Sequence, residues 1–329
     1  STFLSRPLCV LLLALLCPLA LGQKPDPEQL QLASVGAAVA SVGNENTLYQ
    51  KRADWVMPIA SVTKLMTALV VLESGAPLNQ WLTVEKRHFP AEANAFSRIR
   101  PGSEAKRSDL LQIAMISSEN YAAYLLARHH PEGYDAFIAA MNAKARALGM
   151  MQTRFVDATG LSDANVSSAN DLVKLVNAAY NNNALRQLST QGSHHVRFRN
   201  PTYTLAFGNT NPLVHSSRWD VLLTKTGYLN AAGRCLVMVA NVGGKDTIVV
   251  LLNSFGTRTP LGDSGRIRRW LENGHGGTVA SAALRYEQEV VELLQQQKAA
   301  ADTASMSATD LAIPTTPKPP ESGCEQQQC

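Results

Sequence analysis

A lysine at the start of an apolar segment constrains the fold of this chain more than any other feature. Residues 65–72 are apolar on almost every face of a predicted helix, and Gly75 follows as a typical helix-ending residue. A helix of this composition is buried in a large domain. Because a buried ammonium group is costly unless it is paired, Lys64 requires a polar partner.

Ser61 is a candidate for that partner, because it stands about one helical turn before Lys64 on the same face. Such a pair has the composition of a nucleophile and its general base. Near a helix start, Ser61 also lies beside backbone N–H groups that can hold an oxyanion. Two alternatives stay open: Ser61 caps the helix, or Lys64 extends its ammonium group to the surface. The same Ser-x-x-Lys spacing recurs at Ser103 and Lys106, so spacing alone does not decide.

Length and composition set the broad class. With 329 residues, of which 45% are hydrophobic, the chain can bury a substantial core in one large domain or two smaller ones. The net charge of +4 is spread along the sequence, so it predicts no nucleic-acid partner and at most weak peripheral association with a membrane. The histidine pairs at 129–130 and 194–195 have no neighbouring ligands at metal-binding spacing, and we expect no metal and no cofactor.

The two ends of the chain differ from its middle. Residues 8–21 are almost entirely apolar, follow Arg6 and precede small residues, which predicts that residues 1–22 are a secretory signal peptide. The apolar run is shorter than the roughly 20 residues that a membrane-spanning helix needs. We expect a flexible N-terminus at residues 23–32, a C-terminal helix at 276–301 and a disordered tail at 302–329.

Three cysteines remain after the predicted signal peptide. Cys235 stands in an apolar run and is expected to be a buried thiol. Cys324 and Cys329 lie in the polar tail, where a bridge between them is one option. So few cysteines exclude a disulfide-based scaffold.

The spacing of apolar residues changes along the chain, from helical before Tyr180 to strand-like after Gly192. Glycine-containing turns at 43–46 and 243–244 predict hairpins between neighbouring strands. The predicted helices after residues 65–72 are 110–116, 121–129, 134–148, 171–180 and one beginning at 267–271. The predicted strands are 35–42, 47–50, 221–228, 236–241 and 247–253, with further alternation over 196–207.

A second polar motif, Ser118-x-Asn120, stands between two predicted helices. This position can project both side chains into a cleft. The structural alternative is that Ser118 only caps the helix that follows. Because Ser168 and Asn170 repeat the pattern, the motif carries little weight by itself.

A third motif, Lys225-Thr226-Gly227, occurs once, where a predicted strand turns polar. Gly227 would let a substrate backbone approach closely, Thr226 can bind a carboxylate, and Lys225 adds positive potential. Taken alone, the tripeptide is also typical of an ordinary turn at the end of a strand.

The three motifs together, in this order, are those of active-site-serine penicillin-binding enzymes. With their surroundings at 60–68, 101–102, 117–123 and 225–235, they resemble the low-molecular-mass D-alanyl-D-alanine peptidases, most closely the penicillin-binding protein 7 type endopeptidases. This resemblance implies an α/β (α+β) fold of the β-lactamase and transpeptidase type, with an antiparallel sheet flanked by helices and an all-helical subdomain. The peptidase domain is expected at residues 33–275.

The resemblance also implies an acyl-enzyme mechanism. Ser61 would attack the carbonyl of a D-alanyl peptide bond, with unprotonated Lys64 as the base. Ser118 would relay a proton to the leaving amine, and Asn120 would orient Lys64 and the substrate amide. Water would then hydrolyse the acyl-enzyme. Lys64 can act in this way only if burial and a nearby positive charge disfavour its protonated form.

The resemblance places substrate binding on the third motif. The strand that carries Lys225, Thr226 and Gly227 would pair with the substrate backbone, and the N–H groups of Ser61 and Tyr228 would hold the oxyanion. The implied partners are stem peptides and crosslinks of peptidoglycan, with β-lactam antibiotics as covalent inhibitors. A periplasmic location suits this family.

Three other functions are weighed against a crosslink-cleaving endopeptidase. A D-alanyl-D-alanine carboxypeptidase shares every motif. A class A β-lactamase needs a loop carboxylate for fast deacylation, and residues 155–170 offer Asp157 and Asp163 but no glutamate, so we expect slow penicillin hydrolysis. An inactive murein-binding module would have no need for Lys64.

Overall fold

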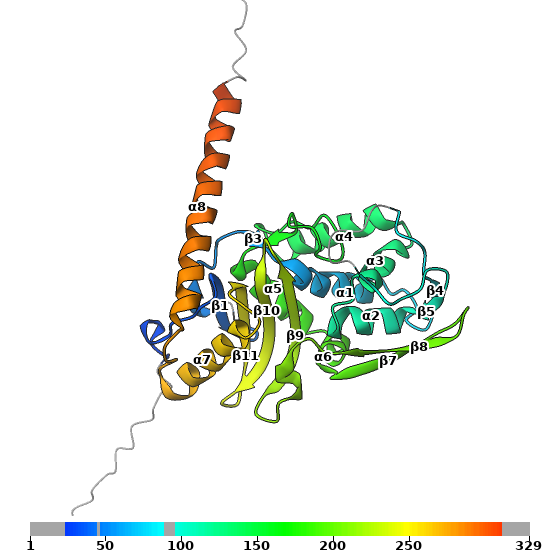
Figure 1. Cartoon of the computed structure of the whole chain (residues 1–329), viewed down its shortest axis with the longest axis horizontal. Helices are drawn as coiled ribbons and strands as arrows, with labels where there is room; N and C mark the ends of the chain where they lie inside the picture. The colour runs from blue at the N-terminus through cyan, green and yellow to red at the C-terminus, as the bar shows by residue number, and fades with distance from the viewer. Residues whose placement is uncertain (1–23, 45–46, 89–95, 311–329) are drawn as a thin grey trace, which may run out of the picture.

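The computed structural model describes residues 24–44, 47–88 and 96–310, with side chains described up to residue 303. The chain forms a lobe built on a β-sheet and a lobe built of helices (Figure 1). The predicted signal peptide and the two tail cysteines, Cys324 and Cys329, lie outside the described residues.

The main sheet has five antiparallel strands in the order β2-β1-β11-β10-β9. Hairpins join β9, β10 and β11 in succession, and β1 pairs with β11. The predicted antiparallel sheet and its two glycine-containing hairpins are thereby confirmed. The strands are β1 Gly36–Ser41, β2 Thr47–Lys51, β9 Asp220–Leu229, β10 Gly233–Val242 and β11 Lys245–Ser254.

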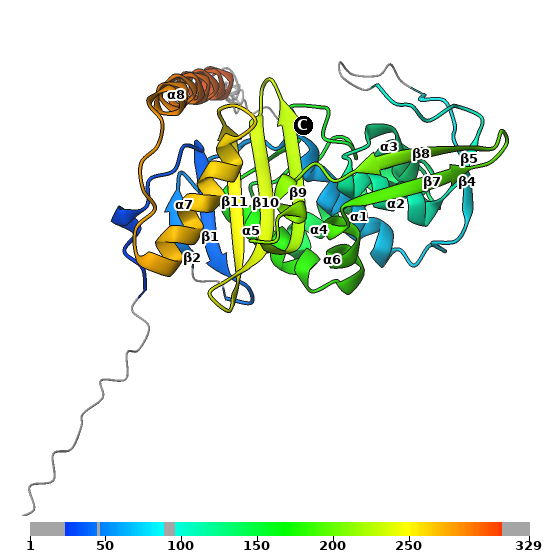
Figure 2. The same ribbon diagram turned by 60° about the horizontal axis from the view of Figure 1, so that its bottom comes forward.

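Both faces of this sheet are covered, which explains why its central strands are nearly continuous apolar runs. Helix α7, Thr259–Asn273, packs on one face, where Ile267 and Trp270 complete a small core (Figure 2). Helix α5, Ala169–Tyr180, and the helical lobe cover the other face. The sheet therefore separates a small core from the large one that contains the helical lobe.

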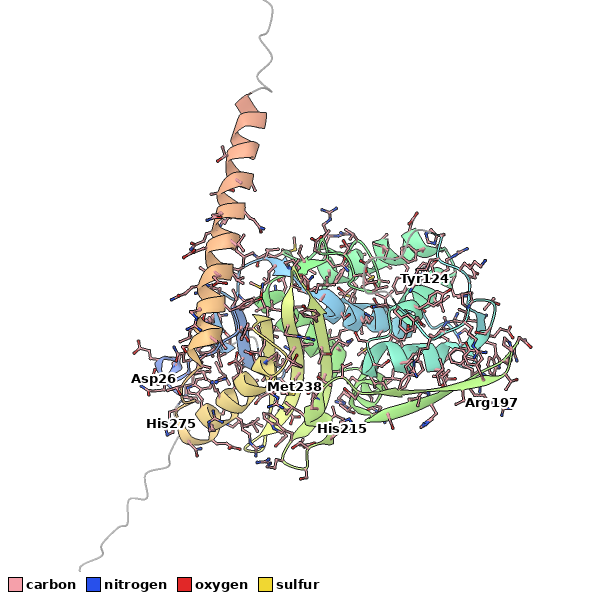
Figure 3. All side chains as sticks on the ribbon, in the orientation of Figure 1. Asp26, Tyr124, Arg197, His215, Met238 and His275 are labelled. Atoms are coloured by element: carbon pink, nitrogen blue, oxygen red, sulfur yellow. The ribbon has the colours of Figure 1, made fainter. Side chains whose placement is uncertain are left out.

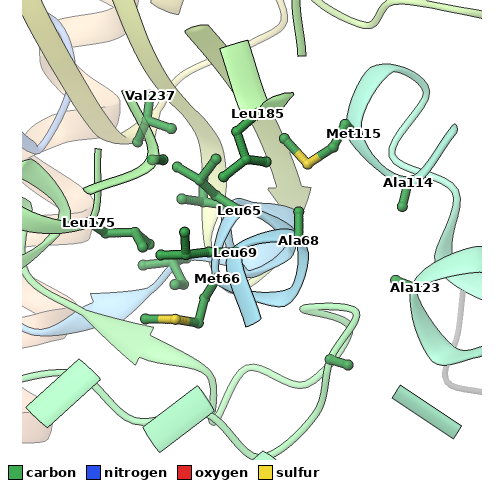
Figure 4. Packing of buried hydrophobic residues seen from close by; sticks show 14 of the residues in the cluster. Leu65, Met66, Ala68, Leu69, Ala114, Met115, Ala123, Leu175, Leu185 and Val237 are labelled. Atoms are coloured by element: carbon green, nitrogen blue, oxygen red, sulfur yellow. The ribbon is translucent and has the colours of Figure 1, made fainter. Parts of the chain in front are cut away.

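Helix α1 runs through the large core, as its apolar composition predicts. Residues 63–71 are all buried. Leu65 and Leu69 of α1 lie near Leu175 of α5 and Leu185 of α6 (Figure 4). The helices of this lobe are α1 Thr63–Glu73, α2 Arg107–Ile116, α3 Asn120–Arg128, α4 Tyr134–Ala147 and α6 Asn183–Thr190.

The sequence does not predict α6, because the three asparagines at 181–183 are typical of a break between helices. The Asn182 side chain accepts a hydrogen bond from the Leu185 backbone N–H and caps this helix. Leu185 is fully buried and anchors the short helix in the large core. The asparagine run thus ends α5 and begins α6.

The remaining strands form short two-stranded ribbons outside the main sheet. The expected alternation at 196–207 is confirmed as a hairpin, but this hairpin runs along the helical lobe (Figures 1 and 2). The ribbons are β3 Met57–Pro58 with β6 Val166–Ser167, β4 Trp81–Thr83 with β5 Glu104–Lys106, and β7 Ser193–Phe198 with β8 Tyr203–Gly208. The short 3-10 helices are η1 Pro27–Gln29, η2 Ala60–Val62 and η3 Pro212–His215.

The segment predicted to be a flexible N-terminus, residues 23–32, packs on the domain at its end. Leu32 is fully buried, and Leu30 is 5% exposed. The following backbone is held by Asp263 of α7, whose carboxylate accepts hydrogen bonds from the N–H groups of Ala33 and Ser34 at 2.9 and 2.8 Å. Apolar side chains and a buried carboxylate therefore order residues whose local sequence predicted mobility.

Helix α8, Ser281–Asp310, begins later than the predicted C-terminal helix and continues past residue 301 into the predicted tail. Its first turns dock on the sheet lobe, where Glu287 forms ion pairs with Lys51 and Arg52, each at 2.8 Å. Beyond these turns the helix projects from the body of the molecule (Figure 1). Over the described part of the chain, no helix combines the length and apolar character needed to cross a membrane.

Replacing Asp263 with alanine tests its role at the N-terminal junction. The substitution would leave two buried backbone N–H groups, the Ser34 hydroxyl and Arg266 without their acceptor. We expect a loss of about 3 kcal/mol in the free energy of unfolding, measured by urea denaturation. Glu272→Ala, which removes an exposed pair with Arg268, should cost less than about 0.5 kcal/mol. Equal losses in both variants would contradict this assignment.

Candidate active site

Lys64 is fully buried at the first turn of α1 and is surrounded by oxygen atoms. Its Nζ atom lies 2.8 Å from Ser61 Oγ. It also lies 2.7 Å from Asn120 Oδ1 and 2.6 Å from the carbonyl oxygen of Thr159. No carboxylate of the described residues forms an ion pair with it. The hydrogen-bond partners of the buried Lys64 are therefore all neutral groups.

This environment favours the neutral amine. Burial lowers the pKa of Lys64 to about 7, although the charges of Asp157 and Glu119 act in the opposite direction. The alternative in which Lys64 reaches the surface is wrong, because none of its side chain is exposed. The capping alternative for Ser61 is also wrong: Ser61 lies within η2, and no side chain caps α1.

The third partner of Lys64 belongs to a tight loop that Asp157 organises. The Asp157 carboxylate accepts hydrogen bonds from the backbone N–H groups of Thr159, Gly160 and Ser162 at 2.6–2.8 Å. This folding turns the carbonyl of Thr159 toward Lys64. A Cβ atom on Gly160 would lie 2.0 Å from the carbonyl oxygen of Ala60. Only a glycine therefore allows the loop to pack so closely against the backbone beside Ser61.

Asn165 fastens the other end of this loop to the start of α1. Its Nδ2 donates to Thr63 Oγ1 at 3.2 Å, and its Oδ1 accepts from the Val156 N–H at 2.7 Å. The backbone carbonyl of Asn165 accepts from the Ile59 N–H at 3.1 Å. The loop and the segment that carries Ser61 are thus connected on both sides.

Ser118 and Asn120 enter the site from the junction of α2 and α3. Glu119, not Ser118, caps α3, because its side chain accepts from the Ala122 N–H. The capping alternative for Ser118 is therefore wrong. Ser118 has a φ of +60°, a left-handed conformation that is costly for a residue with a side chain. The Ser118 Oγ accepts a hydrogen bond from Lys225 Nζ at 2.9 Å.

Lys225 is the second buried lysine of the site and stands on β9. Its Nζ donates to Ser118 Oγ and, at 2.8 Å, to the carbonyl oxygen of Thr226. Burial holds its pKa well below the usual range, and the charge of Lys64 acts in the same direction. Two buried ammonium groups in one site disfavour each other, so the site resists carrying both charges.

Gly227 brings β9 next to Ser61. A Cβ atom at this position would lie 3.0 Å from the backbone nitrogen of Ser61 and 3.1 Å from the carbonyl oxygen of Ile59. Because β9 is an edge strand, every second N–H along it points away from β10. The strand therefore combines close contact with Ser61 and an edge that no other strand of the main sheet covers.

A cleft of about 320 Å³ opens beside these side chains. Arg234 lies in its wall, with its guanidinium carbon 3.9 Å from the centre of the Tyr228 ring. Among the described residues no carboxylate lines the cleft, and Arg234 contributes a positive charge to its wall. Its lining is Ser61, Ser118, Asn120, Thr210, Pro212, Thr226, Gly227, Tyr228, Arg234, Cys235, Leu236, Thr257, Pro260 and Leu261.

The structure separates the repeated motifs from the three that meet here. Ser103 Oγ donates to the carbonyl of Arg100, and Lys106 lies beside Trp81, so these two side chains form no pair. Ser168 caps α5 through the Asp171 N–H. Only the first copy of each motif reaches the cleft.

Comparison with known proteins agrees with this geometry. A family model described as D-alanyl-D-alanine carboxypeptidase, peptidase S11, matches residues 23–256. The chain belongs to this family. It is therefore a serine-type hydrolase, and the resemblance inferred from its three motifs is confirmed.

Relatives of this S11 peptidase include two enzymes named D-alanyl-D-alanine endopeptidase. The Escherichia coli (strain K12) protein is 46% identical over 84% of this chain and 88% of its own length. The Pseudomonas aeruginosa protein is 44% identical over 85% of this chain and 92% of its own. This chain therefore aligns with nearly the whole length of each relative.

Solved structures confirm the fold. The Streptomyces K15 DD-transpeptidase superposes with a TM-score of 0.68 at 30% identity, covering 74% of this chain and 98% of that one. Penicillin-binding protein D2 of Listeria monocytogenes, in its ampicillin-bound form, gives 0.64 at 28% identity, over 74% of this chain and 99% of that one. The predicted transpeptidase-type fold of this S11 peptidase is thus confirmed.

Sequence reasoning missed three contributors to the site: the Thr159 carbonyl, Gly160 and Arg234. A backbone carbonyl has no signature in a sequence. An aspartate followed three residues later by glycine is a turn signal at Asp157, but it does not say what the turn contacts. Arg234 reaches the cleft only because β10 places it opposite Tyr228.

Gly160→Ala tests the close packing of the loop in this S11 peptidase. We expect the added methyl group to displace the Thr159 carbonyl from Lys64 and to slow acylation by penicillin about ten-fold or more. The rate is measured with a fluorescent penicillin. Gly102→Ala is the matched control, because Gly102 has a φ of +89°, near the +83° of Gly160, and nothing within 4 Å of its Cβ position. Similar rates in both variants would refute the role of the loop.

Proposed function

We propose that this protein is a D,D-endopeptidase that hydrolyses D-alanyl crosslinks of peptidoglycan through an acyl-enzyme on Ser61. The observation that carries the proposal is the burial of Lys64 with its Nζ 2.8 Å from Ser61 Oγ. A hydroxyl group becomes an effective nucleophile when an adjacent base can take its proton. Lys64 can do so near neutral pH because its pKa is about 7.

The partners of Lys64 support proton transfer from Ser61 to Lys64. A neutral amine has two N–H donors and one lone pair. Asn120 Oδ1 and the Thr159 carbonyl can only accept, so they take the two N–H groups. The lone pair then faces Ser61 Oγ, which donates its proton to it. Asn120 thus acts as a positioning residue for the base.

Ser118 and Lys225 suit the departure of the leaving amine. In the proposed reaction Lys64 takes the Ser61 proton as the bond from Ser61 Oγ to the substrate carbonyl carbon forms. The C–N bond then breaks, and the proton passes from Lys64 through Ser118 to the leaving amine. The contact of Ser118 Oγ with Lys225 Nζ, at 2.9 Å, holds the hydroxyl in place for this relay. Deacylation reverses these roles, with water in place of the amine.

Strand β9 is assigned to substrate recognition. Its free edge can pair with an extended substrate backbone, while Thr226 lines the cleft for a substrate carboxylate. Gly227 allows that backbone to lie close to Ser61. The N–H groups of Ser61 and Tyr228 are the proposed oxyanion donors.

The preference for crosslinks is supported by the relatives, since those at 46% and 44% identity carry the name endopeptidase. A linear peptide with a terminal D-alanine presents the same bond, so carboxypeptidase activity is the second candidate. Relatives with that name are less similar, at 31% identity or below. Peptidoglycan stem peptides as partners and a location in the periplasm complete the proposal.

Acylation by penicillin tests the nucleophile. Intact-mass analysis of the mature protein with excess penicillin should show a stable adduct, which peptide mapping locates on Ser61. Ser61→Ala should form none and lose at least about 10³-fold in peptidase activity. The adduct should persist, because Asp157 is engaged by loop N–H groups, Asp163 is exposed, and no carboxylate of the described residues lines the cleft. Rapid penicillin turnover would instead indicate a β-lactamase.

The products from peptidoglycan distinguish the two peptidase candidates. Chromatography of digested sacculi should show crosslinked dimers converted to monomers by the parent protein and not by Ser61→Ala. Release of terminal D-alanine without loss of dimers would favour the carboxypeptidase. An unreactive parent that still binds sacculi would favour the inactive module.

The pH dependence of acylation tests the base. If neutral Lys64 is the reactive form, the acylation rate should rise with pH, by about ten-fold per unit below pH 7, and level off above it. Glu119→Gln removes a charge that raises the pKa of Lys64, so the midpoint should move to lower pH. An acylation rate that does not change with pH, or a midpoint that is the same in Glu119→Gln and the parent, would exclude Lys64 as the base.

A further inference from the structure

A second hollow, of about 390 Å³, lies on the helical lobe where the β4–β5 ribbon meets β7. Trp81, Lys106, Arg197 and Arg199 line it, together with Thr202. It shares no residue with the cleft at Ser61. In Figure 3, Arg197 lies at the end of the molecule that is remote from α7. None of the roles proposed above uses this hollow, which we call the distal basic hollow.

The charges around the hollow are unbalanced. One carboxylate of the lining, Asp109, is held by His194 at 2.8 Å. The nearby Glu104 is held by Arg199 at 2.7 Å. Neither Lys106 nor Arg197 forms an ion pair with any described residue. Three cations, Lys106, Arg197 and Arg199, thus stand against the two carboxylates of Asp109 and Glu104, which leaves an excess of positive charge.

The surrounding chain adds to this positive potential. No aspartate or glutamate occurs in residues 172–219, which contain the whole β7–β8 hairpin. Beside the hairpin, exposed Arg98 donates to the carbonyl of Ala206 at 2.6 Å. Exposed Arg100 lies over the ring of Tyr203 at 4.5 Å. The hollow is the centre of a wider basic surface.

Contacts with Trp81 hold two of the cations in place. The Arg199 guanidinium carbon lies 4.1 Å from the centre of the indole ring, and Lys106 Nζ lies 5.7 Å from it. Backbone hydrogen bonds between Glu104 and Arg199 fix β5 against β7. Cations positioned in this way lose less freedom when they bind an anion. Trp81 thus positions Lys106, one of the two lining cations that form no ion pair.

We propose that the distal basic hollow binds free carboxylates of the peptidoglycan whose crosslinks the Ser61 cleft cleaves. This inference rests on the proposed function, because it takes the ligand from the same polymer. Lys106 and Arg197 supply charge-assisted hydrogen bonds, and Thr202 supplies a hydroxyl. A polymer with many stem peptides can occupy both sites at once. Binding at the hollow then raises the concentration of crosslinks at the cleft.

Sedimentation with purified sacculi tests the proposal. The variant carries Lys106→Gln and Arg197→Gln, and binding is measured in a Ser61→Ala background so that cleavage does not release the protein. We expect binding on the order of ten-fold weaker than that of Ser61→Ala alone, and weaker at higher salt. The control carries Arg146→Gln and Lys245→Gln, which remove two exposed cations elsewhere and should leave binding unchanged.

Two further arms identify the ligand. In the first arm the carboxylates of the sacculi are amidated. The Ser61→Ala protein should then bind as weakly as the variant binds to untreated sacculi. Anionic phosphatidylglycerol vesicles should show no difference between the two proteins. The proposal is overturned if the variant and its parent bind untreated sacculi equally, if the control loses as much as the variant, or if only vesicle binding falls.

Penicillin acylation separates this proposal from the function it rests on. Lys106→Gln with Arg197→Gln, in a protein that retains Ser61, should be acylated at the parent rate within about two-fold, because the hollow lies outside the cleft. A variant that also loses acylation would refute an independent second site. If the parent itself forms no adduct, the proposed peptidase function fails, while the sedimentation result still decides whether the hollow binds the polymer.

Discussion

The burial of Lys64 is the constraint on which the rest of this structure depends. An amine in the large core is tolerable only if neutral oxygen atoms surround it, and each of its partners comes from a different segment. The Asp157 turn, the strained backbone at Ser118 and the close contact of β9 with Ser61 all belong to this arrangement. The same burial that costs stability lowers the pKa of the amine into the range where a general base works.

Much of this arrangement could be predicted from the sequence, because it follows from periodicity and from residue types. The apolar face pattern predicted α1, and alternation with glycine turns predicted the β9–β10–β11 meander. The misfit of Lys64 pointed to Ser61. Features without such a signal were missed: α6 is anchored by the burial of Leu185 in the large core, and the burial of Leu32 likewise depends on residues distant in the sequence.

In the site, too, some contributors could be predicted from the sequence and others could not. Side chains with distinctive chemistry, such as Lys225, could be proposed from their motifs, whereas the Thr159 carbonyl could not, since any residue supplies one. Strand pairing places Arg234 beside Tyr228 across a hairpin, and it brings together the distant segments that line the distal basic hollow. Both depend on tertiary pairing, namely the register of β10 with β9 and the contact of β5 with β7.

The distribution of the site over two lobes has a consequence for the timing of activity. Ser118 and Asn120 belong to the helical lobe, Lys225 belongs to the sheet, and Lys64 lies where the two meet. While either lobe is unfolded, water surrounds the Lys64 amine and its proton affinity returns to that of an ordinary lysine. With Lys64 as the proposed base, the chain is therefore inert until both lobes have folded, so that hydrolytic activity depends on the complete fold.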